Sequence, residues 1–396
     1  MFDRARHIPL RDHAWNAHEA HAAIEEIAED AVSHLDPEGF WPAHPLDDNT
    51  EDGHTSFYMG ATGTVWALDR LGRVGALKEP IDLEPIVPRL VAHNAAEFTP
   101  ERFGKYAAHG SLLFGELGTL LVAMRLQPSS AFADAAFIHA EANNALPVRE
   151  LMWGTPGSML ACVHMAEMSR EPRWRALFGA QAARLLAELE ETEFGPLWTQ
   201  DLYGSHERWL GPVHGYAGNM LALLRGWDWL SDQQRARIAD AVPKTLLQNA
   251  ARSELGVNWQ AVASREAPKL CQHCHGAPGM VTAFAGAPFS SPTMDELLLQ
   301  GGELAWAAGP LAKGPGLCHG TGGNGYAFLK LHRRTGDAKW LMRARAFAMT
   351  AIAQYREARA QYGRDRYTLW TGDPGLALYL WGCIAEDPAF PTIDNF

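Results

Sequence analysis

Two kinds of helical segment alternate along the chain. One kind has apolar residues at helical spacing on one face and charged residues on the other, which is typical of an outer helix. The other kind is apolar nearly all round and follows a glycine-rich turn, as expected of a buried helix. The amphipathic kind is predicted at 20–35, 84–98, 171–191, 231–250 and 337–358. Strand-like alternation is sparse, so the pattern predicts an all-α protein.

A Gly-x-x-Gly turn precedes each apolar segment and recurs seven times. The first glycines of these turns are Gly60, Gly115, Gly154, Gly215, Gly276, Gly320 and Gly372. One repeat therefore takes about 52 residues, close to the longest periods of common repeat architectures. An open solenoid requires polar capping repeats, and none is evident at either end. The sequence therefore predicts a closed, double-layered α/α toroid of seven helix-GxxG-helix repeats, with residues 1–396 as a single domain.

The glycines suggest how each repeat is built. The first glycine of a turn is expected to take a left-handed or tight conformation, and the second to let inner helices pack closely. Each turn would then lie at the N-terminal end of an inner helix. Residues just before the turns are therefore predicted to converge near the central axis, at one end of the toroid.

Composition and charge disfavour several classes of function and location. The chain has 46 acidic and 34 basic residues, a formal charge of -12 and no Lys/Arg cluster, which disfavours a nucleic-acid partner. No segment reaches the about 18–20 apolar residues of a membrane span, and residues 1–21 lack the apolar core of a signal peptide. Five cysteines without disulfide-like spacing favour a reducing, cytoplasmic location and a metal-binding or catalytic use.

Cysteine and histidine stand at matching positions before two neighbouring turns. Cys274 lies two residues before Gly276, and Cys318 and His319 lie two residues and one residue before Gly320. Two cysteines and a histidine form a soft three-ligand set that suits Zn²⁺, and three protein ligands leave the open position of a catalytic site.

Two other interpretations of the same cysteines remain open. Cys271 could complete a closed structural site with Cys274, Cys318 and His319, although it lies outside the register that the other two cysteines share. A redox Cys-x-x-Cys motif is disfavoured, because no strand-helix context surrounds it. An open site would favour thiol attack, since a metal lowers the pKa of a bound thiol below its free value of about 8.5.

Two more residues with acid-base chemistry precede the turns of the third and fourth repeats. Glu150 lies four residues before Gly154, and His214 lies directly before Gly215. An imidazole titrates in the range needed to move a proton near neutral pH, so His214 is a candidate acid or base.

With these motifs the sequence resembles the LanC-like family, which comprises lanthionine cyclases and their eukaryotic-type relatives. The resemblance spans nearly the whole chain, and its most specific parts are "CHGAPG" and "GLCHGTGGNGYAFL". It implies a double-layered helical toroid with a catalytic zinc on Cys274, Cys318 and His319. It also matches His214, in "PVHGYAGN", to the proton-transfer histidine of the family's Ala-His-Gly motif, with Val213 in place of the alanine.

The resemblance implies a thiol substrate and a dehydroamino-acid acceptor. Cyclases join a peptide cysteine to dehydroalanine or dehydrobutyrine, whereas the eukaryotic-type relatives bind glutathione and add its thiol to such residues in proteins. Glu150 in "ELMWGTPG" and Lys313 in "KGPGLCHG" resemble the glutathione-binding subgroup. The predicted function is therefore zinc-dependent addition of a thiol, in the first place glutathione, to these residues. The alternatives are a peptide cyclase and a non-catalytic glutathione- or protein-binding scaffold with structural zinc.

Expected roles follow for the remaining residues. His214 and Glu150 would handle protons at the α carbon and the enolate, and His275 would be a second acid or an orienting group beside the zinc. Lys313 would hold an anionic thiol, or else be a solvated loop lysine. His273 stands where the family usually has tryptophan, and is expected to lie on the surface or to reshape substrate entry.

Overall fold

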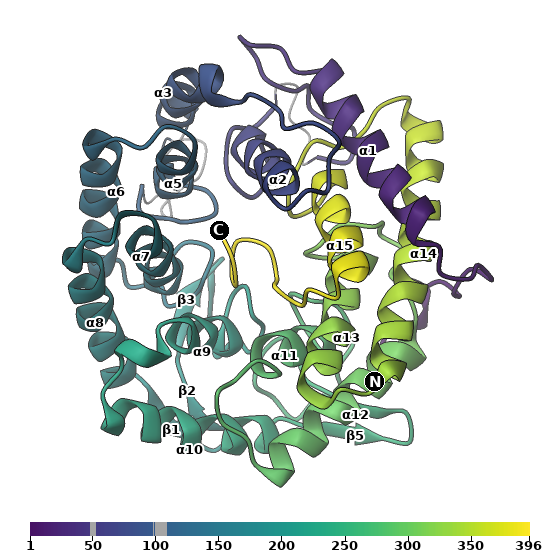
Figure 1. Ribbon diagram of the computed structural model, residues 1–396. Helices are drawn as coiled ribbons and strands as arrows, with labels where there is room; N and C mark the ends of the chain where they lie inside the picture. The colour runs from purple at the N-terminus through teal and green to yellow at the C-terminus, as the bar shows by residue number, and fades with distance from the viewer. Residues whose placement is uncertain (48–52, 98, 100–108) are drawn as a thin grey trace.

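The computed structural model describes residues 1–47, 53–97, 99 and 109–396. Within these residues, two concentric rings of helices surround a central axis (Figure 1). The inner ring consists of α2 (Ala61–Arg73), α5 (Glu116–Leu126), α7 (Thr155–Ser169), α9 (Tyr216–Arg225), α11 (Ala277–Phe284), α13 (Thr321–Thr335) and α15 (Asp373–Ala385). The outer ring consists of α1 (Ala17–Ser33), α3 (Val87–Glu97), α6 (Ser130–Ala142), α8 (Pro172–Ala187), α10 (Asp232–Gln248), α12 (Pro292–Ala308) and α14 (Ala338–Tyr362).

The predicted all-α toroid is confirmed. Every Gly-x-x-Gly turn leads into an inner helix, and the five amphipathic segments form α1, α3, α8, α10 and α14. Residue 98, at the end of one predicted segment, lies outside the described residues. The structure adds α6 and α12 to the outer ring, so that each inner helix has an outer counterpart.

Short antiparallel hairpins join some of the helices. β1 (Glu190–Thr192) pairs with β2 (Gly195–Leu197), and β3 (Gln200–Leu202) with β4 (Ser205–Glu207), both between α8 and α9. The pair β5 (Ala251–Ser253) and β6 (Gly256–Asn258) lies between α10 and α11.

Burial separates the two rings as the hydrophobic pattern predicts. All eight residues of α11 are buried, whereas α1 buries only eight of its 17 residues and leaves Glu29 exposed. Apolar area removed from water stabilises the fold by about 25 cal/mol per Å². The inner ring is therefore the core of the molecule, and the Gly-x-x-Gly turns lie at the N-termini of these buried helices.

The first glycines take the tight conformation that the sequence predicts, because a Cβ on Gly60 or Gly215 would lie 2.1 or 2.2 Å from backbone atoms of the pre-turn loop. Among the seven first glycines only Gly276 has a left-handed φ, of 119°, while the other six have negative φ values. At the second glycine, a Cβ would meet a backbone carbonyl of the loop six residues earlier. Such a Cβ on Gly279 would lie 1.9 Å from the His273 oxygen, and one on Gly323 would lie 1.7 Å from the Leu317 oxygen. These glycines therefore let the pre-turn loop fold back onto its own helix.

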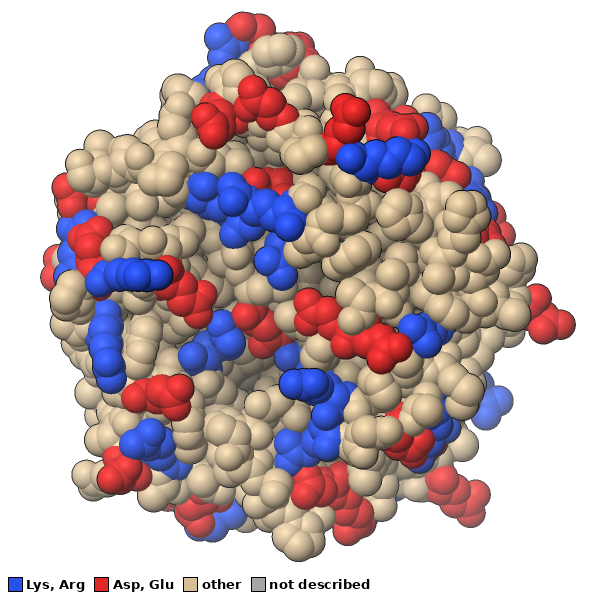
Figure 2. All heavy atoms as spheres, in the orientation of Figure 1, with Lys and Arg blue, Asp and Glu red and all other residues tan. Residues whose placement is uncertain are grey.

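The C-terminal segment lies in the middle of the ring (Figure 1). Phe396 packs against Phe57 and Trp66, and the Asp394 carboxylate lies 2.6 Å from the Lys330 ammonium. On the face shown in Figure 2, Lys and Arg side chains are interspersed with Asp and Glu. None of the described helices has the length and apolar character needed to cross a lipid bilayer.

Candidate metal centre and acid-base pair

The loops before α11 and α13 bring three potential metal ligands together. The ligand atoms of Cys274, Cys318 and His319 all lie within 4.8 Å of one another, and the Cys318 Sγ is 3.6 Å from the His319 Nε2. Tetrahedral zinc with Zn–S of about 2.3 Å and Zn–N of about 2.0 Å would place those two atoms about 3.5 Å apart. The donor set and its spacing therefore fit this metal.

Hydrogen bonds between successive loops hold the cluster in place. The Cys274 backbone N–H donates to the Cys318 carbonyl at 3.3 Å, and the Cys318 N–H donates to the Trp370 carbonyl at 2.8 Å. The Trp370 N–H in turn donates to the carbonyl of Tyr58, two residues before the first turn, at 3.2 Å. The loops of the first, fifth, sixth and seventh repeats thus meet at one point.

The two thiols of the cluster differ in their protonation. Burial alone would raise the pKa of Cys274, but hydrogen bonds with Cys318 and His319 bring that pKa well below its ordinary value. Burial and the neighbouring Cys274 raise the pKa of the Cys318 thiol. A cation is the natural partner for two thiolates so close together.

Cys271 lies apart from the three-residue cluster among the described residues. Its side chain is buried, which raises the pKa of its thiol to about 12. Its backbone carbonyl accepts a hydrogen bond from Asn324 at 3.0 Å. The geometry therefore favours a three-ligand site over the closed Cys₃His set.

Glu150 and His214, from the third and fourth repeats, form a hydrogen-bonded pair that is the second candidate unit of the site. The His214 Nδ1 lies 2.9 Å from one Glu150 oxygen, and the other oxygen accepts from the backbone N–H groups of Trp153 and Gly154. The Glu150 side chain is 0% exposed and that of His214 is 17% exposed. The carboxylate therefore fixes the ring of His214 and leaves Nε2 as the nitrogen that can exchange a proton.

His275 connects this pair with the metal ligands. It follows Cys274 directly, and its ring stacks on that of His214 with the centroids 6.2 Å apart. Burial lowers the pKa of His275. Tyr203, at the tip of the β3–β4 hairpin, packs edge-on against the His214 ring, with the ring centroids 5.4 Å apart.

Two asparagines fix the loops of the two units in equivalent ways. Asn219 donates to the Arg149 carbonyl at 2.9 Å, and Asn324 donates to the Cys271 carbonyl at 3.0 Å. Each asparagine lies four residues after the first glycine of its own turn. Each carbonyl that accepts the hydrogen bond lies five residues before the first glycine of the preceding repeat's turn. The loops of neighbouring repeats are therefore joined in the same register at both units.

His273 has neither of the positions expected from the sequence. Its side chain is 0% exposed and stacks on Phe390 of the C-terminal segment, with ring centroids 4.3 Å apart and an interplanar angle of 10°. Burial lowers its pKa to about 4. His273 is therefore a neutral core residue beneath the metal ligands.

Lys313 lines two adjoining cavities near His319. The smaller, of about 110 Å³, is bounded by Tyr58 and His319, and the larger has about 600 Å³, within the range of about 300–1,000 Å³ of small-molecule sites. Both are lined by Leu46, Lys313, Gly314, Arg366 and Thr371. The smaller cavity therefore lies between His319, one of the candidate metal ligands, and the larger cavity.

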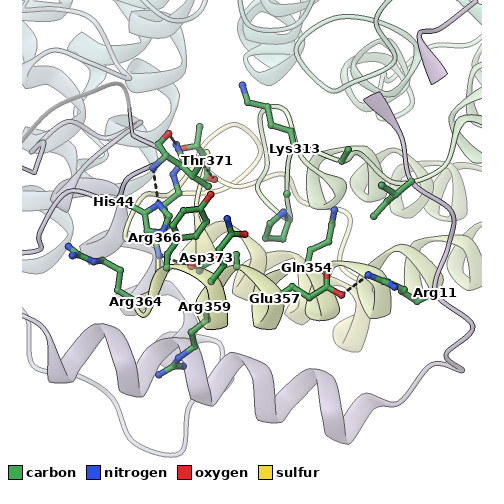
Figure 3. Close-up of a pocket in the computed structure, with 18 of the residues that line it drawn as sticks. Arg11, His44, Lys313, Gln354, Glu357, Arg359, Arg364, Arg366, Thr371 and Asp373 are labelled. Atoms are coloured by element: carbon green, nitrogen blue, oxygen red, sulfur yellow. Dashed lines mark hydrogen bonds and ion pairs between the residues drawn. The ribbon is translucent and has the colours of Figure 1, made fainter. Parts of the chain in front are cut away.

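The larger cavity is rich in cationic side chains. Arg11, Lys313, Arg359, Arg364 and Arg366 line it, and Figure 3 shows that they come from separate loops and from α14 and point in different directions. Arg11 and Arg366 are paired with Glu357 and Asp47, respectively. Burial raises the pKa of Asp373, another lining residue, to about 7, so its negative charge is incomplete at neutral pH. Arg359 is paired with Asp30 and Asp365. Cationic side chains therefore outnumber acidic ones in the lining, although three of the five cations are ion-paired.

Several residues of the site escaped the sequence analysis. Tyr58 and Gln272 lie in the pre-turn register, two and four residues before a first glycine, so the same count could have found them. Arg6 and Arg366 lie near the site only through the fold, and no sequence pattern marks them.

Comparisons with known proteins agree with this architecture. Residues 10–394 match the family model described as lanthionine synthetase C-like protein. The solved structure of nisin cyclase superposes with a TM-score of 0.56 and 13% identity, covering 93% of this chain and 98% of that one. At that identity the likeness concerns the fold.

Two curated relatives match shorter segments. Glutathione S-transferase LANCL1 of Danio rerio is 46% identical over 81 residues, which is 20% of each chain. LanC-like protein GCL1 of Arabidopsis thaliana is 33% identical over 151 residues, covering 37% of this chain and 34% of that protein. The matched segments thus span well under two thirds of either relative. Because the family model covers nearly the whole sequence, the chain belongs to the lanthionine synthetase C-like family.

Proposed function

We propose that the chain is a zinc-dependent enzyme that adds a thiol, in the first place glutathione, to dehydroalanine or dehydrobutyrine residues of a peptide or protein. The observation that carries this proposal is the placement of Cys274, Cys318 and His319 within 4.8 Å, beside the Glu150–His214 pair. Zn²⁺ on these three ligands would leave one position for a substrate thiol and would lower the pKa of that thiol.

The reaction needs a proton donor as well as a thiolate. The sulfur attacks the β carbon, the electrons of the carbon-carbon double bond move toward the α carbon and its carbonyl, and a proton then adds to the α carbon. The product is a thioether, and no other reactant is required. His214 supplies the proton from Nε2, while Glu150, being fully buried, acts through His214 by fixing its ring. His275, stacked on His214, is the second candidate for this donor.

The cationic cavity supports an anionic thiol substrate. Glutathione carries two carboxylates, and a cavity with Lys313 and several arginines near His319 suits such a molecule. The name of the zebrafish relative, a glutathione S-transferase, supports the same choice of thiol.

The test is an adduct assay with matched variants. Zinc-loaded protein would be incubated with glutathione and a dehydroalanine-containing peptide, and the thioether adduct followed by mass spectrometry. Adduct formation is expected with the native protein and with the controls Cys271→Ala and His206→Ala. It is expected to be lost in Cys318→Ala and strongly slowed in His214→Ala.

Other outcomes would redirect the assignment. If no glutathione adduct forms while a cysteine-containing dehydropeptide is cyclised, the protein is a peptide cyclase. If neither reaction occurs although zinc is bound, the toroid is a binding scaffold. Loss of metal from Cys271→Ala would support a closed structural zinc site.

A further inference from the structure

Gln272 contacts a metal ligand that the proposed function requires. Its side chain is 3% exposed, and its Nε2 lies 2.9 Å from the Cys274 Sγ. Backbone hydrogen bonds in both directions between Gln272 and His275, at 3.1 and 3.2 Å, close a tight turn around the cysteine. The amide therefore approaches the sulfur from a fixed backbone.

The other end of the Gln272 side chain contacts the N-terminal segment. The Arg6 Nη2 donates to the Gln272 Oε1 at 2.9 Å. The backbone of this segment is fixed to the toroid on both sides, because Asp3 donates to the Lys269 carbonyl and Ala312 donates to the Arg6 carbonyl. Arg6 therefore reaches the fifth-repeat loop from a fixed position.

Arg6 determines which way the amide of Gln272 points. A guanidinium group has only donors, so the atom of the amide that faces it must be the oxygen. The NH₂ group then faces Cys274 and donates toward its sulfur. The orientation thus follows from the chemistry of the two neighbours.

Gln272 occupies the position in its repeat that is equivalent to that of Glu150 in the third repeat. Gln272 lies four residues before Gly276, as Glu150 lies four residues before Gly154. Glu150 fixes an imidazole through a carboxylate, whereas Gln272 offers a neutral donor to a thiolate. A carboxylate at position 272 would face the sulfur with like charge and would have no proton to donate.

We infer that Gln272, oriented by Arg6, is a positioning residue that holds the Cys274 sulfur by an N–H···S hydrogen bond and reduces the electron density that this sulfur donates to the metal. The inference rests on the proposed function only in that the cluster binds a metal ion. Groups that hydrogen-bond a ligand commonly change metal affinity or activity about 10- to 100-fold when removed.

The test uses the cobalt-loaded protein, whose sulfur-to-metal charge-transfer absorption reports the electron density on the cysteine sulfurs. Gln272→Met removes the donor at similar volume, and Arg6→Met frees the amide to turn. Both variants are expected to move the band to longer wavelength, and Gln272→Met to weaken cobalt binding about 10-fold or more in a chelator competition. Lys269→Met removes a nearby exposed cation without touching Gln272, so it should leave band and affinity as in the native protein.

The double variant decides whether the two residues act as one unit. If Arg6 works through Gln272, Arg6→Met/Gln272→Met should equal Gln272→Met alone. An unmoved band in both single variants would overturn the inference, as would independent, additive effects. Circular dichroism would verify the fold, and Arg6→Met, in the partly exposed N-terminal segment, tests the inference even if Gln272→Met misfolds. A native protein that binds no cobalt would instead overturn the proposed function, and the inference with it.

Discussion

The third and fourth repeats and the fifth and sixth repeats use one loop register for two kinds of chemistry. In both pairs an asparagine of the later repeat donates a hydrogen bond to a backbone carbonyl of the earlier repeat. That carbonyl lies five residues before the first glycine of the earlier repeat's turn. The residue after that carbonyl is Glu150 in one pair and Gln272 in the other. The first bonds a histidine, and the second bonds a cysteine.

The difference between the pairs lies in the charge that each partner tolerates. An imidazole that gains a proton is stabilised by a carboxylate, so Glu150 suits His214. A thiolate would be repelled by a carboxylate, so the neutral amide of Gln272 suits Cys274. The same backbone would thus support the proposed acid-base pair or the proposed metal ligand, depending on a few side chains in the pre-turn loop.

The largest expected effect is on the candidate metal centre of Cys274, Cys318 and His319, here called the metal side. The Glu150–His214 pair is called the acid-base side. Cys318→Ala removes one of three ligands, so its loss of metal affinity should exceed the about 10- to 100-fold that is typical of losing an outer partner. Thiol addition should disappear with the metal. Metal content and chelator competition would be measured, with the buried Cys271→Ala as the matched control. Equal metal loss in both variants would contradict the three-ligand site.

The next effect concerns the acid-base side alone. His214→Ala should lower the rate of thiol addition about 10²- to 10⁴-fold, the usual contribution of a positioned acid or base, and should leave the metal in place. Glu150→Gln should cost less, because the amide can still bond the ring but supplies no charge to a protonated imidazole. Steady-state rates and metal content would be measured together. Metal loss in His214→Ala would show that the two sides are not separable.

The sequence was sufficient to predict the fold and most residues of the candidate site because both follow the repeat register. Counting back from each glycine located Cys274, Cys318, His319, His214 and Glu150, whose side chains the structure brings together in two units. Gln272 occupies the same position in its repeat as Glu150, but a neutral amide carries no sequence signal of acid-base or metal-binding chemistry.

Contacts between residues far apart along the chain could not be predicted from the sequence. Arg6 is 266 positions from Gln272, and only the path of the N-terminal segment brings them together. His273 was expected at the surface or at the substrate entry, but the aromatic surface of Phe390, from the C-terminal segment, covers it. Periodicity describes how each repeat is built, and carries no information on where the two chain ends pack.

The two asparagines allow the comparison to be tested in the loops themselves. Asn219 and Asn324 are both 0% exposed, and their removal leaves a buried carbonyl without its donor, at a cost of about 1–3 kcal/mol each. Denaturant unfolding should therefore show similar destabilisation in Asn219→Ala and Asn324→Ala. Function should separate them, because Asn219 supports the loop of Glu150 and Asn324 supports the loop of Cys274.

The two asparagine variants should differ in whether the rate of thiol addition or the metal affinity falls. Asn219→Ala should slow thiol addition with metal affinity unchanged, whereas Asn324→Ala should weaken metal binding. If both variants lost metal affinity to the same extent, the loops would form one mechanical unit, and the division into two sides would be wrong.

The smallest effect concerns the thiol and its approach to the metal side. Lys313 is solvent-exposed, so its attraction for an anionic thiol should contribute only about 0.2–1 kcal/mol, or a roughly 1.5- to 5-fold rise in KM for glutathione in Lys313→Ala. The effect should fade as salt screens the charge, and should be absent for an uncharged thiol. Lys269→Ala, which removes another exposed lysine, should leave KM unchanged. A KM increase of the same size for charged and uncharged thiols would mean that Lys313 shapes the cavity rather than attracting the substrate, because a steric contribution does not depend on the charge of the thiol.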